Sequence, residues 1–155
     1  LALMLNDERI GTTVDIVSKQ LSLGGSYITP EEVKLEAESI ALTDSYTYDS
    51  GDDTYTHSAS DGSQFALVTF RSENLSSQPV DVPDTFEIYL LDSRNQYESG
   101  SYRKETDEYA GGTLFSGAVK QGIILYEIPD SVTKSDLRVA WTGTYVEGDV
   151  AVRWT

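Results

Sequence analysis

The sequence has no cysteine, a single histidine and few basic residues. Without cysteine the chain can form no disulfide, no thiolate metal site and no thiol nucleophile. The one histidine, His57, lies in a polar stretch without a recognisable nucleophile, so neither a His-rich metal centre nor a Ser-His-Asp enzyme is expected. No apolar run approaches the roughly 18 to 20 residues of a membrane-spanning helix. These absences favour a non-enzymatic protein without a transmembrane segment.

Positive charge is scarce. The 155 residues include 11 Lys and Arg against 26 Asp and Glu, which gives a net charge of −15. A surface of this sign repels phosphate backbones, so nucleic acid is not an expected partner. The acidic residues are spread along the chain, as in halophilic proteins, where salt screens the repulsion between carboxylates. An acidic extracellular protein from an ordinary environment is the alternative.

Alternation of apolar and polar residues with period two dominates the chain and predicts β-strands. It is clear over residues 33–38, although Thr29, Pro30 and the two glutamates that follow also resemble the start of a helix. Residues 65–70 are apolar on both faces, as in a central strand between two layers. Further strands are expected over residues 86–91, 122–129, 137–141 and 150–154, with Trp141 and Trp154 in the core, and over residues 14–17. Such a set of short strands predicts an all-β sandwich or barrel.

Two segments resemble a known family. Residues 65–74 followed by 78–80 form a strand and turn, and residues 112–117 followed by 122–129 form a glycine-bounded link and a strand that ends in proline. Both are similar to motifs of a family of secreted immunoglobulin-like domains of unknown function, related to the mycobacterial immunoprotective extracellular antigen. The resemblance implies an immunoglobulin-like antiparallel β-sandwich of about seven to eight strands, located outside the cell or on its envelope. It implies no catalytic residue.

The similarity covers roughly residues 33–154. We therefore expect residues 33–155 to form the sandwich and residues 1–32 to be an N-terminal extension or an extra strand. Residues 1–5, Leu-Ala-Leu-Met-Leu, are apolar. They are expected to pack on the domain, to continue an upstream anchor, or to insert into a neighbouring copy as an added strand, which would make a homo-oligomer.

The polar stretch over residues 49–63 is expected to be an exposed hairpin loop. Asp49, Asp52 and Asp53 give it the densest group of carboxylates in the chain. Carboxylate oxygens in a glycine-containing loop suit Ca²⁺, although no EF-hand spacing is present. The alternatives are a calcium site, which would be the only cofactor, and a solvated acidic loop.

Two further sets of residues are candidate binding or modification sites. Tyr46, Tyr48 and Tyr55, with the later tyrosines 97, 102 and 109, are candidates for an aromatic platform on which a sugar could pack; ordinary strand tyrosines are the alternative. Asn74 begins an Asn-Leu-Ser acceptor motif for N-glycosylation on an expected turn.

The expected function is therefore recognition. The sequence predicts a non-enzymatic extracellular or cell-surface domain that binds another protein or a surface polymer, or displays a surface, through loops on a rigid sandwich. A structural subunit of an extracellular filament or virus particle and a carbohydrate-binding module are the alternatives.

Overall fold

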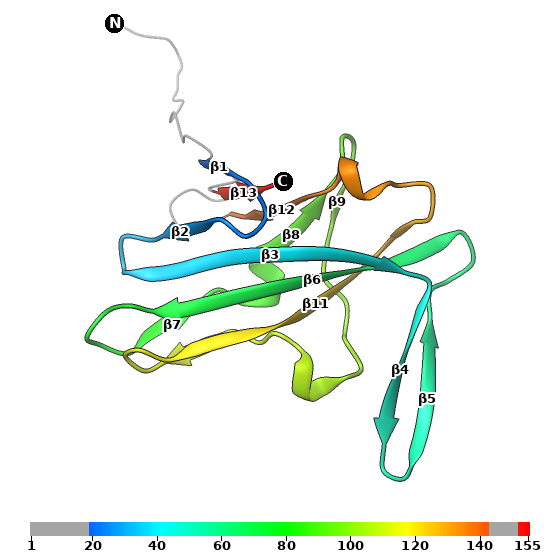
Figure 1. Ribbon diagram of the computed structural model, residues 1–155, viewed down its shortest axis with the longest axis horizontal. Helices are drawn as coiled ribbons and strands as arrows, with labels where there is room; N and C mark the ends of the chain where they lie inside the picture. Colours follow the sequence, from blue (N-terminus) through cyan, green and yellow to red (C-terminus); the bar gives the residue numbers. More distant parts are fainter. Residues whose placement is uncertain (1–18, 143–151) are drawn as a thin grey trace, which may run out of the picture.

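The computed structural model describes residues 19–142 and 152–155, which form two packed β-sheets with a projecting hairpin (Figure 1). One sheet has four strands in the order β11-β6-β3-β2, and the other has five in the order β1-β13-β12-β8-β9. Strands β10 and β7 form one separate pair, and β4 and β5 form another. The expected strand over residues 14–17, residues 1–5 and Val150 lie outside the described residues. The prediction of an all-β sandwich is confirmed.

The strands are β1 (Lys19–Leu21), β2 (Ser26–Ile28), β3 (Val33–Thr43), β4 (Ser45–Ser50), β5 (Asp53–Ser58), β6 (Ser63–Asn74), β7 (Val80–Val82), β8 (Ile88–Leu91), β9 (Gln96–Tyr97), β10 (Gly112–Leu114), β11 (Val119–Pro129), β12 (Arg138–Trp141) and β13 (Val152–Trp154). Three short 3₁₀ turns join them: η1 (Thr85–Glu87), η2 (Glu105–Asp107) and η3 (Lys134–Asp136). These strands outnumber the seven or eight expected because several pairings of two or three residues add to the longer strands. The pair β1–β13 is parallel and all other pairs are antiparallel.

The period-two pattern of β3 explains how this strand faces the core. Val33, Leu35 and Ala37 are buried while the residues between them are half-exposed. The pairing with β6 shifts after Ala37, where Glu38 is an extra residue, so that Ile40 returns to the buried face. Such a bulge lets a strand keep its apolar residues inside although the sequence breaks strict alternation.

The core lies between the two sheets. The four-stranded sheet contributes apolar side chains such as Leu35, Val68 and Phe70, and the five-stranded sheet contributes residues that include Val139 and Trp154. The Phe70 and Trp154 rings meet edge to face, with their centroids 5.8 Å apart. Both tryptophans are buried, as the sequence predicts.

The predicted strand over residues 86–91 is wrong at its start, where Phe86 lies in a turn. The strand begins only at Ile88, because residues 85–87 form the turn η1. The Asp84 amide donates to the Glu87 carboxylate (3.0 Å), and the Glu87 amide donates to the Asp84 carbonyl (3.0 Å). This turn directs Phe86 outward, where the side chain is 69% exposed.

Two other local expectations are decided by turn geometry. The helix alternative after Thr29 is wrong: the Glu32 amide donates to the Thr29 carbonyl (2.9 Å), and Glu32 adopts a left-handed conformation (φ 66°) before β3 begins. The expected loop over residues 49–63 is largely strand, because β4 and β5 pair as far as Ser50 and Asp53. Gly51, at φ 64°, occupies the first central position of that two-residue turn, where type II′ turns favour glycine.

Candidate functional site

The β4–β5 hairpin projects away from the two sheets (Figure 1). Its cross-strand pairs place four ring-bearing side chains on one face, since Tyr46 lies opposite His57 and Tyr48 lies opposite Tyr55. The other face carries mainly hydroxyl groups, including the pair Thr47 and Thr56. The period of two along each strand thus separates an aromatic face from a polar face.

The base of the aromatic face is fastened to the sandwich by four rings, Tyr46, His57, Phe65 and Tyr102, which we call the anchor cluster. The centroid of the Tyr46 ring lies 4.8 Å from that of Tyr102 and 5.7 Å from that of Phe65. The His57 ring centroid lies 4.9 Å from that of Phe65. Phe65 and Tyr102 are buried, so the cluster joins the hairpin to the protein interior.

Hydrogen bonds reinforce the anchor cluster. The Arg103 main-chain amide donates to Tyr46 Oη (2.8 Å), and Tyr46 Oη lies 2.9 Å from His57 Nδ1. Burial raises the pKa of the Tyr46 and Tyr102 hydroxyls. Burial also lowers the pKa of His57, and the positive charge of Arg103 lowers it further. Both effects favour the neutral form of His57, whose ring belongs to the attachment of the hairpin.

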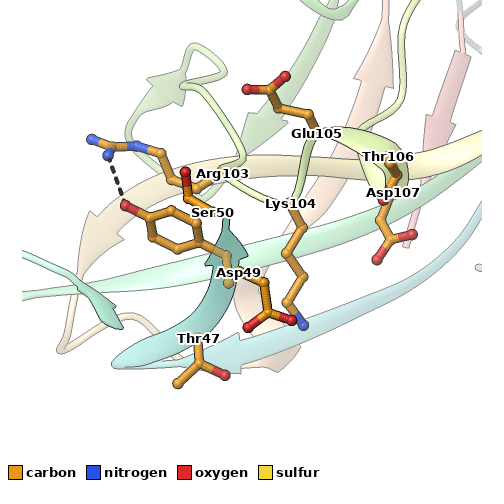
Figure 2. A pocket seen from close by; sticks show the side chains of 9 residues that line it. Thr47, Asp49, Ser50, Arg103, Lys104, Glu105, Thr106 and Asp107 are labelled. Atoms are coloured by element: carbon orange, nitrogen blue, oxygen red, sulfur yellow. Dashed lines mark hydrogen bonds between the residues drawn. The ribbon is translucent and has the colours of Figure 1, made fainter. Parts of the chain in front are cut away.

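A cleft of about 700 Å³ separates the hairpin from the segment that contains η2 (Figure 2). The hairpin side carries Tyr48 and Asp49 together with hydroxyl groups, and the η2 side carries Arg103, Lys104 and two acidic residues. The Arg103 guanidinium approaches Tyr48 Oη at 3.4 Å. The cleft is lined by Thr47, Tyr48, Asp49, Ser50, Arg103, Lys104, Glu105, Thr106 and Asp107.

The chemistry of this cleft suits a polar, neutral or mixed-charge ligand. Two of the eleven basic residues of the chain line it, together with carboxylates and hydroxyls. The Tyr48 and Tyr55 rings stack beside the cleft, with their centroids 5.7 Å apart and their planes 27° apart. Donors, acceptors and an aromatic pair therefore lie together at one site.

The structure brings Tyr46, Tyr48 and Tyr55 onto one face, but not as three equivalent rings. Tyr46 packs against Tyr102 and Phe65, and so anchors the hairpin. Tyr102 and Tyr109 are buried, so the expectation that they extend an exposed platform is wrong. Tyr48 and Tyr55 remain as the rings near the cleft.

Arg103 and Lys104 are cleft residues that the sequence patterns did not single out. Basic residues are rare in so acidic a chain, and this rarity is the one sequence feature that could have drawn attention to them. It does not predict that residues 103–104 face residues 47–50. That contact joins segments more than fifty residues apart, which only the fold brings together.

The calcium prediction is not supported by the placement of its residues. Asp49, Asp52 and Asp53 lie around the tip of the hairpin, and Asp49 Oδ1 accepts a hydrogen bond from the Thr54 hydroxyl (2.8 Å). Within residues 19–142 and 152–155, no three acidic or histidine side chains converge closely enough to hold a metal ion. Ca²⁺ takes six to eight oxygen ligands, of which the described carboxylates do not supply three at one point of this tip.

The glycosylation prediction for Asn74 is contradicted by burial. The residue is fully buried, and its Nδ2 donates to the carbonyls of Gln78 (2.7 Å) and Leu114 (3.0 Å). Its Oδ1 accepts hydrogen bonds from both the amide and the hydroxyl of Ser76. The amide nitrogen that a glycan would modify is therefore occupied inside the folded domain, where it connects two turns.

Comparison with models of known protein families finds no match, and comparison with curated protein sequences finds none either. Several solved structures share the fold. An uncharacterised β-sandwich protein of Clostridium difficile 630 is 14% identical, with a TM-score of 0.58, covering 92% of this chain and 96% of the other. The secreted Mycobacterium tuberculosis protein MPT63 is 16% identical, with a TM-score of 0.54, covering 88% of this chain and 96% of that protein.

A third similar structure is the putative lipoprotein ycdA of Bacillus subtilis, which is 15% identical with a TM-score of 0.56. The similarity covers 83% of this chain but 37% of that protein. Among the described residues, no helix has the length and apolar character to cross a membrane. At these identities the likenesses establish the β-sandwich fold.

Proposed function

We propose that this chain is a non-enzymatic binding domain of the cell exterior or envelope, which recognises another protein or a surface polymer in the cleft under the β4–β5 hairpin. One observation carries the proposal: the hairpin projects from the sandwich, yet the anchor cluster fastens its base to the interior. A projecting element that is held in place offers a preformed surface, so less conformational entropy is lost on binding.

The location outside the cell rests on the fold. Structures that share it include a protein described as secreted and another described as a putative lipoprotein. A non-enzymatic role is supported by the placement of His57, because its ring packs on Phe65 and its Nδ1 lies beside Tyr46 Oη. That histidine serves to hold the hairpin.

A carbohydrate is the second candidate for the ligand of this cleft. It is favoured by the stacked pair of Tyr48 and Tyr55 beside Arg103, Lys104 and Asp49. Sugars combine apolar ring faces with many hydroxyls, so they use aromatic surfaces and mixed donors and acceptors together.

The test is binding of the full chain to an array of defined oligosaccharides and, separately, to cell-envelope proteins, in wild type and in two arginine variants. Arg103→Ala removes one of the two cations that line the cleft but keeps the main-chain hydrogen bond to Tyr46 Oη. Arg94→Ala, in the exposed turn before β9, is the matched control because it changes the net charge equally. We expect Arg103→Ala to weaken binding at least tenfold and Arg94→Ala to leave it unchanged. Equal effects of the two variants would show that the cleft is not the binding site.

A further inference from the structure

The end of the sandwich away from the hairpin carries four of the six exposed large hydrophobic residues in the described part of the chain. It contains the turns that lead into β3, out of β6 and from β10 to β11 (Figure 1). Four exposed apolar side chains lie in or next to these turns, and we call them the end surface: Ile28, Leu75, Phe115 and Val119. Among the described residues, the other exposed large hydrophobic residues are Tyr55 of the hairpin and Phe86 of η1.

Hydrogen bonds hold the turns of the end surface together. The Leu75 amide donates to the Glu32 carbonyl (2.9 Å), and the Gly117 amide donates to the Asn74 carbonyl (2.9 Å). Asn74 Nδ2 also reaches the Leu114 carbonyl (3.0 Å). The three turns therefore form one connected part of the molecule, and exposed apolar side chains gathered in this way are typical of a protein-interaction site.

A pocket of about 340 Å³ opens between the segment that enters β3 and the segment that contains β7. Its walls include the buried side chains of Val33, Val82 and Trp141. Three acidic residues also line it, namely Glu31, Asp81 and Glu87. Phe86, which is highly exposed, directly precedes Glu87 in the chain.

Trp141 is left with an unused hydrogen-bond donor. The residue is 4% exposed, and within the described part of the chain its Nε1 has no acceptor. The other tryptophan shows the usual arrangement, since Trp154 Nε1 donates to the Gly25 carbonyl (2.8 Å). Buried donors are almost always paired, so an unpaired one beside a pocket indicates a place for an acceptor from a ligand.

Among the described residues, no basic side chain forms an ion pair with the carboxylates of the pocket. The ion pairs seen among residues 19–142 and 152–155 join Lys34 and Arg71 to Glu36 and Glu73, and none includes a pocket residue. In the described part of the chain, the Glu87 carboxylate accepts one hydrogen bond, from the Asp84 amide (3.0 Å), and Asp81 accepts one from the Thr113 hydroxyl (2.7 Å). The pocket thus combines apolar walls, an indole ring and uncompensated negative charge.

We propose that this pocket binds the side chain of a lysine or arginine presented by a partner protein. The methylene groups of such a side chain pack on valine and tryptophan, while its ammonium or guanidinium group pairs with the carboxylates. An indole is also the aromatic ring that attracts cations most strongly.

A protein is favoured over a free amine because of the surroundings of the pocket. A small amine would fill the pocket but leave Ile28, Leu75 and Phe86 exposed, whereas a protein surface would cover them. The net charge of −15 further favours a basic partner, because it speeds the encounter of oppositely charged surfaces. This inference does not depend on the cleft under the hairpin, which lies elsewhere on the domain.

The experiment follows the two indole N–H resonances of the ¹⁵N-labelled full chain, assigned with Trp141→Phe. The probes are acetyl-Leu-Lys-Leu-amide, the same tripeptide with norleucine in place of lysine, and n-butylamine. We expect the lysine tripeptide to shift the Trp141 resonance while that of Trp154 stays in place. The norleucine tripeptide, which lacks only the ammonium group, is expected to bind at least tenfold more weakly.

Two variants, each of which removes one negative charge, test whether the pocket carboxylates bind the lysine side chain. Glu31→Gln alters a pocket residue and is expected to weaken binding of the lysine tripeptide at least threefold. Glu98→Gln alters an exposed glutamate after β9, outside the pocket, and is expected to change nothing. An unmoved Trp141 resonance, equal binding of both tripeptides, or equal effects of the two variants would overturn the proposal. Equal affinity for n-butylamine and the lysine tripeptide would overturn the protein partner in favour of a small amine.

Discussion

Replacing Asn74 with alanine tests whether this residue is a structural connector rather than a glycosylation acceptor. Its side chain makes four hydrogen bonds: two donated by Nδ2, to Gln78 and Leu114, and two accepted by Oδ1, from Ser76. These bonds join the turn after β6 to the end of β10. Asn74→Ala removes all four hydrogen bonds, so that the partner groups of Ser76, Gln78 and Leu114 can form hydrogen bonds only with water in their place.

The expected cost follows from the burial of those partners. Leu114 is buried, so its carbonyl loses a hydrogen bond that water does not readily replace, at about 1 to 3 kcal/mol. Ser76 is half-buried and Gln78 is exposed, so water can restore most of the other three bonds, at about 0.5 kcal/mol each. We therefore expect Asn74→Ala to lower the free energy of unfolding by about 2.5 to 4.5 kcal/mol.

The assay is urea unfolding at a fixed high salt concentration, followed by tryptophan fluorescence. Ser76→Ala is the matched control, because it also destroys the Asn-Leu-Ser motif but keeps the Ser76 amide bond to Asn74 Oδ1. It is expected to cost about 1 kcal/mol or less. A loss below about 1 kcal/mol for Asn74→Ala, or equal losses for both variants, would show that Asn74 does not connect the two turns.

Three further outcomes are expected. Phe86→Ala should change the free energy of unfolding by less than about 0.5 kcal/mol, whereas Trp154→Ala should cost about 3 to 5 kcal/mol; similar losses in urea unfolding would contradict the outward placement of Phe86. His57 should titrate by NMR below its ordinary pKa of 6.5, and Arg103→Ala should raise that midpoint. Because the folded state favours neutral His57, the contribution of this residue to stability is present above pH 6.5 and is lost as pH falls through the lowered pKa. A titration midpoint of His57 at or above pH 6.5 would refute this. Finally, the melting temperature should rise steadily from dilute buffer to molar KCl as salt screens the net charge of −15, and a flat response would show that carboxylate repulsion does not limit stability.

The candidate site illustrates what sequence reasoning can and cannot reach. The tyrosines of the hairpin are recognisable in the sequence as a group, because alternate residues of a strand share a face. Their division into an anchor and an exposed pair is not recognisable, because it depends on where Tyr102 and Phe65 pack. The same holds for Arg103 and Lys104, which face the hairpin only after the chain has folded.

The predictions that Asn74 is glycosylated and that Phe86 begins a strand failed for a common physical reason. Polarity alone favours the surface for Asn74 and the interior for Phe86, and in both places local hydrogen bonding and turn geometry override that preference. Asn74 is buried because four hydrogen bonds satisfy its amide. Phe86 is exposed because a short turn precedes the strand that it was expected to begin.

The sequence by itself determined the β-sheet character and the long central strands. Alternation over residues 33–38 and the apolar run over residues 65–70 predict strands whatever the remaining chain does. The second face of the latter strand is only partly covered, because Leu67 and Thr69 are half-buried. Tertiary structure alone decided the contents of the cleft and the pocket. Tyr48 contacts Arg103, and Glu31 and Trp141 line the same pocket, across long stretches of chain. Such proximity depends on the order of the strands and on how their connecting turns pack, and the local periodicity of the sequence does not predict that order.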